Sequence, residues 1–121
     1  MKFSCRRELF IKNLQIAQRA TDVKSNITIL RNVLLDASGD KLEIVGFDHR
    51  IGIRTGMECT VEEEGSITMP CGLALEVLGV MQEDTVYFTL DGYVMQVECG
   101  KSRYSINCLS AEDFPQFPET T

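Results

Sequence analysis

Residues 7–20 read RELFIKNLQIAQRA, and this stretch decides the fold because the α helix that it predicts has two different sides. The mostly apolar side carries Leu9, Phe10, Asn13, Leu14, Ile16, Ala17 and Ala20, and the polar side carries Glu8, Lys12, Gln15, Gln18 and Arg19. Lys12, Gln15 and Arg19 follow the spacing i, i+3, i+7, which aligns them along the open side. The pattern predicts a helix that packs with one side and offers two cations and an amide, groups suited to phosphates, with the other.

Basic residues concentrate at the start of the chain. Residues 1–31 hold seven Lys or Arg against two acidic residues, a net charge of +5, whereas the remainder holds five against sixteen, a net charge of −11. A charged stripe on an amphipathic helix is more often a solvated face than a binding surface. The segregation of charge favours a binding surface here, although the overall charge of −6 argues against a nucleic-acid partner for the molecule as a whole.

The composition is that of one soluble domain. Its 121 residues, 44% hydrophobic and 25% charged, suffice for a core without cross-links. The cysteines form no CxxC pair and His49 is the only histidine, so a metal site has no recognisable spacing; the cysteines are Cys5, Cys59, Cys71, Cys99 and Cys108. No signal peptide and no apolar run of roughly 18 residues is found. We therefore expect a cytoplasmic protein with reduced thiols, no metal, no cofactor and no membrane partner.

Turn residues and apolar periodicity divide the chain into two similar halves. In the first half they predict strand 1–5, the helix, strands 27–36 and 41–47, and one long alternating strand over 51–62. In the second half they predict strand 66–69, a helix over 71–81 with Pro70 in its first turn, and strands 84–90, 93–99 and 102–109. The half-repeats, about 1–64 and 65–109, are thus two β-α-β-β-β units, and residues 110–121 form an extended exit segment. This duplication predicts an α+β domain with both helices side by side on one face of antiparallel sheets.

The second predicted helix differs from the first because it is apolar around nearly its whole circumference. Its apolar residues are Leu73, Ala74, Leu75, Val77, Leu78, Val80 and Met81, which leaves only Gly72, Glu76 and Gly79 as a non-apolar strip. A helix of this kind needs cover on more than one side. Either it is buried deeply in the core, or Leu73 and Val77 extend into a protein interface.

An enzymatic interpretation rests on two residues. Cys71 lies at the start of the second helix, where the helix dipole lowers a thiol pKa, and His49 is the only candidate for its base. Nothing in the sequence places the two together. The sequence has no phosphate-binding glycine loop and no isolated carboxylate pair in an apolar setting. A small thiol enzyme using Cys71 and His49 therefore stays as an alternative, not as the main hypothesis.

Several segments together resemble one known family. They are the opening Met1-Lys2-Phe3 strand with its helix, residues 27–35 (ITILRNVLL), Gly46-Phe47-Asp48, and residues 101–106 (KSRYSI) running into 109–115 (LSAEDFP). Over essentially all 121 residues the chain resembles the N-terminal domain of the bacterial DNA polymerase III beta subunit, the sliding clamp.

The resemblance implies a DNA-clamp fold and a role without catalysis. Clamps of this family have three such domains per chain, and two chains form a homodimer ring around double-stranded DNA with helices lining the hole. This chain would be the first domain of a processivity factor that holds the replicative polymerase on DNA without reading its sequence. DNA polymerase III subunits and the clamp loader would bind through later domains. A freestanding clamp-like domain that oligomerises through its last strand is a further alternative.

The resemblance also assigns site residues by position. The DNA-binding residues would be Lys12, Gln15, Arg19, Lys24 and Gly72. Gly72 stands where clamps often carry a basic residue, so its contribution would come from its backbone alone. The dimer interface would combine Leu73 and Val77 on the second helix with Lys101, Arg103, Tyr104 and Ile106 on the last strand.

Overall fold

The two halves of the chain exchange their first strands. The structure is a computed structural model that describes residues 1–22 and 24–115. The first half contains β1 (Lys2–Arg6), α1 (Arg7–Gln18), the 3-10 helix Thr28–Arg31, β2 (Asn32–Ser38), β3 (Lys41–Phe47), β4 (Gly52–Glu58) and β5 (Thr60–Glu63). The second half contains β6 (Gly65–Pro70), α2 (Cys71–Gly79), β7 (Thr85–Asp91), β8 (Val94–Cys99), β9 (Ser102–Asn107) and the 3-10 helix Ala111–Asp113.

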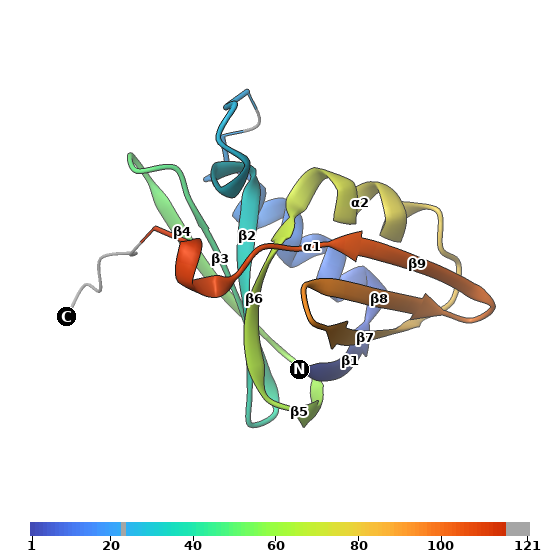
Figure 1. The fold of residues 1–121 in the computed structure, drawn as a ribbon. Helices are drawn as coiled ribbons and strands as arrows, with labels where there is room; N and C mark the ends of the chain where they lie inside the picture. Colours follow the sequence, from blue (N-terminus) through green and yellow to red (C-terminus); the bar gives the residue numbers. More distant parts are fainter. Residues whose placement is uncertain (23, 116–121) are drawn as a thin grey trace.

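These strands form two antiparallel sheets (Figure 1), one in the order β5-β1-β7-β8-β9 and one in the order β4-β3-β2-β6. Strand β1 of the first half pairs with β7 of the second, with Phe3 opposite Phe88. Strand β6 of the second half pairs in turn with β2 of the first, with Ile67 opposite Leu35. The predicted α+β architecture of two β-α-β-β-β units is confirmed, and the exchange of strands explains why neither half is an independent unit.

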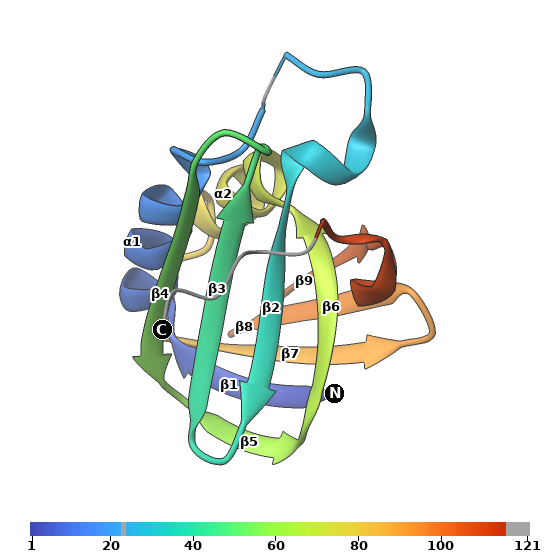
Figure 2. The same cartoon turned by 90° about the vertical axis from the view of Figure 1, so that its left-hand side faces the viewer.

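Both helices lie on the same side of the four-stranded sheet, next to each other (Figures 1 and 2). Helix α1 contacts β3 and β4 closely because β3 carries Gly46, where a Cβ atom would overlap the backbone oxygen of Ala17. A larger residue at position 46 would push α1 off the sheet. Gly46 therefore sets the depth at which α1 sits.

The core joins the two halves through three phenylalanines. Phe3 of β1 stacks on Phe88 of β7 with 4.7 Å between ring centroids, and Phe10 of α1 lies 4.7 Å from the same Phe88 ring. All three rings are buried. Aromatic pairs at this spacing add stability beyond the area that they bury. The start of the chain is therefore fixed to the second half by side chains as well as by strand pairing.

Three predicted boundaries are wrong. The strand predicted over 27–36 begins only at Asn32, because Thr28–Arg31 forms a 3-10 turn that inserts Leu30 into the core. The long strand predicted over 51–62 breaks at Cys59. The N–H of Cys59 still donates to Asp40 O, in the turn before β3 of the four-stranded sheet, whereas Thr60 already pairs with β1 in the five-stranded sheet. The exit segment is not simply extended, because Ser110 caps a 3-10 turn by accepting from the N–H of Glu112. Residues 116–121 of that segment lie outside the described part of the chain.

Candidate nucleic-acid interface

Helix α1 presents the predicted polar face to solvent. Lys12, Gln15 and Arg19 are exposed, whereas Phe10 and Leu14 on the other side are fully buried. The rotation of the helix is further fixed by a buried amide: Asn13 Nδ2 donates to Leu9 O at 2.9 Å, and Thr55 Oγ1 of β4 donates to Asn13 Oδ1. Because the buried side is held by both apolar and polar contacts, the cationic stripe has only one direction in which to point.

The positive charges of this face are not neutralised within the described structure. The ion pairs among residues 1–22 and 24–115 are Lys2–Glu62, Arg50–Asp48, Arg54–Glu43 and Arg103–Glu98. None of them includes Lys12, Arg19 or Lys24. An exposed cation without a carboxylate partner keeps its full attraction for a polyanion at low salt.

Lys24 lies in the connector that follows α1. Asp22 anchors this connector, since its N–H donates to Leu30 O at 2.8 Å and its side chain accepts from the N–H of Lys24 at 3.2 Å. The Lys24 side chain itself is exposed. The connector after α1 therefore carries a third exposed cation, five residues after Arg19 in the sequence.

Helix α2 offers a different surface. It contains no lysine or arginine, and Gly72 is exposed with no atom within 4 Å of the position that a Cβ would occupy. Leu73 and Val80 are 45% and 64% exposed, so the prediction of a deeply buried helix is wrong for these two residues. The open side of α2 therefore carries small and apolar residues together with one acidic residue, Glu76, where that of α1 is cationic.

The predicted dimer interface divides into an exposed and a buried part. Leu73 on α2, Arg103 and Tyr104 on β9, and Lys101 in the turn before β9 are exposed, and α2 and β9 contact each other. Arg103 and Tyr104 follow each other in a strand, so they point to opposite faces of the sheet. Val77 and Ile106, by contrast, are only 8% and 1% exposed, because both point into the core beneath that edge. Their assignment to the dimer interface stays a prediction, and in this chain both side chains are buried.

The alternative of a thiol enzyme needs an accessible nucleophile, and Cys71 is not accessible. Cys71 is buried and its Sγ lies 3.6 Å from Leu14 O, in a setting where burial raises the pKa of the thiol to about 12. The predicted lowering of this pKa by the helix dipole is wrong because desolvation outweighs it. His49 lies elsewhere, exposed in the turn between β3 and β4 with its ring 5.3 Å from that of Phe47. The predicted Cys71–His49 pair is not assembled.

Neither a metal-binding cluster nor a membrane-spanning helix occurs among the residues that the structure describes. Among residues 1–22 and 24–115, no three or more His, Cys, Asp or Glu side chains gather in a way that could hold a metal ion. Over the same ranges, every helix is too short or too polar to cross a membrane.

Sequence reasoning missed the role of Arg7, which it counted only as one of the early cations. Its backbone N–H donates to Asp84 O at 2.7 Å, and its guanidinium donates to Glu83 O at 2.9 Å and to Leu78 O at 3.1 Å. From the beginning of α1, Arg7 therefore satisfies one carbonyl group in the last turn of α2, Leu78 O, and two in the loop between α2 and β7, Glu83 O and Asp84 O. The available signal was that the last turn of α2 carries no basic residue of its own.

Paired helices over two antiparallel sheets with exchanged first strands define the DNA-clamp fold, and solved clamps share it. The structure of the DNA polymerase III subunit beta from Pseudomonas aeruginosa matches with a TM-score of 0.90 at 26% identity, covering 99% of this chain and 33% of that one. A family model described as DNA polymerase III beta subunit, N-terminal domain, matches residues 1–118. The chain belongs to this family.

Individual relatives agree with this assignment. The beta sliding clamp of Synechococcus elongatus is 31% identical over 121 residues, a match that covers 98% of this chain and 32% of the relative. The beta sliding clamp of Vibrio harveyi is 32% identical over 123 residues, a match that covers 98% of this chain and 83% of that sequence. The chain spans about a third of the length of most of the curated relatives that it matches.

Proposed function

We propose that this chain is the first of three domains of a ring-forming sliding clamp, which encircles duplex DNA and tethers the replicative DNA polymerase in the cytoplasm. Its role is non-catalytic. The observation that carries the proposal is the cationic face of α1, whose Lys12 and Arg19 take part in no ion pair among residues 1–22 and 24–115, on a chain of this family whose residues 32–121 carry a net charge of −11. The sites of the polymerase and the clamp loader belong to the later domains.

The chemistry of this face suits phosphates and not bases. The exposed side of α1 carries Lys12, Gln15 and Arg19, and the opposite side of the helix packs against its sheet. These side chains can therefore reach the sugar-phosphate backbone of a duplex that passes over them, but the helix does not enter a groove of the DNA. Contacts with phosphates position a protein without reading sequence, and their strength depends on the release of counterions. A surface of this type lets DNA slide past.

Acidic residues elsewhere serve the same end. With a net charge of −11 over residues 32–121, the rest of the chain repels DNA that approaches from outside the ring. Productive binding is then limited to the face that carries the cations. The segregation of charge thus directs DNA toward the cationic face of α1.

Ring closure is assigned to the edge formed by α2 and β9. Leu73 and Tyr104 supply apolar area, and Lys101 and Arg103 supply charge at its margin. An apolar centre with a polar rim is the usual composition of a protein interface. The partner is the third domain of a second copy, with complementary acidic residues.

A chimeric clamp tests the function. The N-terminal third of the Synechococcus elongatus clamp is replaced by this chain, and the length of primer extension is measured with the cognate polymerase and loader on a circular template. We expect long products, and we expect the Lys12→Glu/Arg19→Glu variant to shorten them. The matched control is Arg6→Glu/Lys41→Glu, which reverses two exposed cations on the strands that also take part in no ion pair among the described residues, and it should leave product length unchanged.

Two outcomes contradict the proposal. A chimera that folds and dimerises but gives only the short products of polymerase alone removes the clamp function. Equal product lengths for both charge-reversal variants keep the clamp but remove the role of α1.

A further inference from the structure

Two cysteines line one pocket where the chain passes from one sheet to the other. Strands β1 and β5 pair antiparallel, with Phe3 opposite Val61 and Ser4 opposite Thr60, where the ladder ends. Its continuation by one residue would set Cys5 opposite Cys59, which is the first residue beyond β5. Directly opposed residues in antiparallel strands have Cα atoms about 4.5–5.5 Å apart, which lies inside the range that a disulfide spans.

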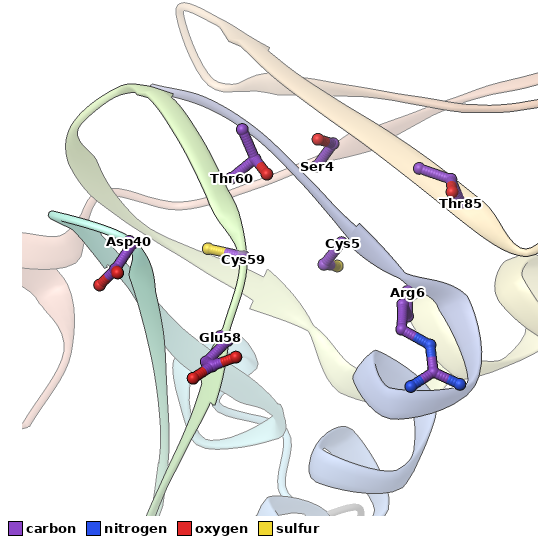
Figure 3. A pocket seen from close by; sticks show the side chains of 8 residues that line it. All are labelled: Ser4, Cys5, Arg6, Asp40, Glu58, Cys59, Thr60 and Thr85. Carbon is purple, nitrogen blue, oxygen red and sulfur yellow. The ribbon is translucent and has the colours of Figure 1, made fainter.

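Both cysteines open into one pocket of about 420 Å³ (Figure 3). Cys5 comes from β1 and is buried, whereas Cys59 comes from the junction between β4 and β5 and is half-buried. In Figure 3 the Cys59 sulfur lies on the side of its strand away from Cys5. Closure therefore needs a rotation of the Cys59 side chain to another staggered rotamer, for which the pocket leaves room.

We propose that Cys5 and Cys59 form a redox-sensitive pair that closes to a disulfide under oxidising conditions and clips β1 to the crossover between the two sheets. The oxidant is a small disulfide such as oxidised glutathione. The more accessible Cys59 attacks it as a thiolate, forming a mixed disulfide and releasing one thiol. Cys5 then attacks the Cys59 sulfur, the Cys5–Cys59 bond forms, and the second thiol leaves. Two protein S–H bonds are lost and one small disulfide is reduced to two thiols.

The environment of the pair sets its rate. Burial raises the pKa of Cys5 to about 12, with a further contribution from Cys59, and burial together with the Asp40 carboxylate raises the pKa of Cys59. The other charged groups that line the pocket are Arg6 of β1 and Glu58 of β4. Because only the thiolate attacks, closure is slow at neutral pH, and its rate rises about tenfold per pH unit below the thiol pKa. The pair therefore stays reduced in a reducing compartment and responds to sustained oxidation.

The remaining cysteines have separate surroundings. The Sγ atoms of Cys99 and Cys108 lie within hydrogen-bond distance of Glu83 O and Ile106 O, and that of Cys71 lies near Leu14 O. Among the described residues, neither ladder register nor a shared pocket brings any of these three against a second cysteine. They serve as internal controls for the pair.

The test is oxidation of the chain with mixtures of oxidised and reduced glutathione at mildly alkaline pH. After acid quenching, alkylation and non-reducing proteolysis, mass spectrometry should find a Cys5–Cys59 peptide lighter by two hydrogens, which dithiothreitol reverses. Cys59→Ser should abolish it. Cys5→Ser should leave Cys59 as a mixed disulfide with glutathione, and the Cys108→Ser control should form the link as the wild type does.

Two results overturn the proposal. One is wild-type Cys59 that accumulates as the mixed disulfide without ever linking to Cys5. The other is a link that forms between other cysteines instead. Because Cys59 is half-buried and Cys108 is buried, circular dichroism of both serine variants before oxidation shows whether each is folded, and Cys59→Ser is the variant on which the conclusion depends.

Discussion

Helices α1 and α2 occupy equivalent places in the two halves, yet their open sides have opposite chemistry. Each follows the first strand of its unit without a linker, and the two lie next to each other. Helix α1 exposes Lys12, Gln15 and Arg19, whereas α2 exposes Gly72, Leu73 and the acidic Glu76. The two units therefore share the order of their elements but not the chemistry of their exposed helix sides. Shared architecture alone does not show which helix meets DNA.

The helices also differ in what holds them. Helix α1 has 12 residues and sits on its sheet at Gly46, with Asn13 bonded to the neighbouring strand. Helix α2 has 9 residues, and Arg7, the first residue of α1, donates to Leu78 O in its last turn and to Glu83 O in the loop that follows. The shorter helix is thus the dependent one.

The largest effect is expected where α1 meets its sheet. In Gly46→Ala the new methyl group overlaps the backbone of Ala17, and backbone cannot move aside without displacing the helix, so we expect a loss of about 3 kcal/mol in the free energy of unfolding. Urea denaturation measures it. The matched control is Gly79→Ala on α2, which meets no atom within 4 Å and should be neutral or stabilising by up to about 0.5–1 kcal/mol. Equal changes in the free energy of unfolding for the two variants would contradict the inference that α1 packs more tightly on its sheet than α2 does.

A smaller effect is expected at the link between the helices. Arg7→Ala removes donors from Leu78 O and Glu83 O, and we expect a cost of about 1–3 kcal/mol. Hydrogen exchange should localise the change to the last turn of α2. Arg7→Lys keeps the charge but loses the forked donors of the guanidinium group, so its free energy of unfolding should lie between those of the wild type and Arg7→Ala. The control Arg6→Ala removes the exposed neighbouring cation and should leave the last turn of α2 protected from exchange. If Arg7→Ala instead speeds exchange throughout α1, then Arg7 supports α1 and not α2.

Local sequence was enough for elements whose ends carry their own signals. Strand β3 was predicted with its observed bounds because alternation ends at turn residues on both sides, and the Gly39 and His49 turns that flank it have positive φ angles of 65° and 73°. The two sides of α1 followed from helical periodicity in the same way. These features need no knowledge of distant residues.

Features that depend on distant partners could not be predicted. The alternation of residues 51–62 continues through Cys59, so nothing local shows that the strand changes sheets to meet β1. Arg7 finds its acceptor 71 residues away in Leu78. Val77 and Ile106 were assigned to a surface by position within a family, but burial depends on how the side chains of α2 and β9 fill the space between them. The assignment of Lys12, Gln15, Arg19, Lys24 and Gly72 to DNA stays a prediction.

The most direct test of the cationic face is the salt dependence of duplex binding by the chain, measured by fluorescence anisotropy at low ionic strength. Removing two phosphate contacts in Lys12→Gln/Arg19→Gln should reduce the slope of log Kobs against log salt by about 1.8, and Gly72→Arg, whose side chain meets open space, should increase it by about 0.9. Both changes should be the same on duplexes of different sequence. A double variant with the wild-type slope would contradict the claim that α1 faces DNA.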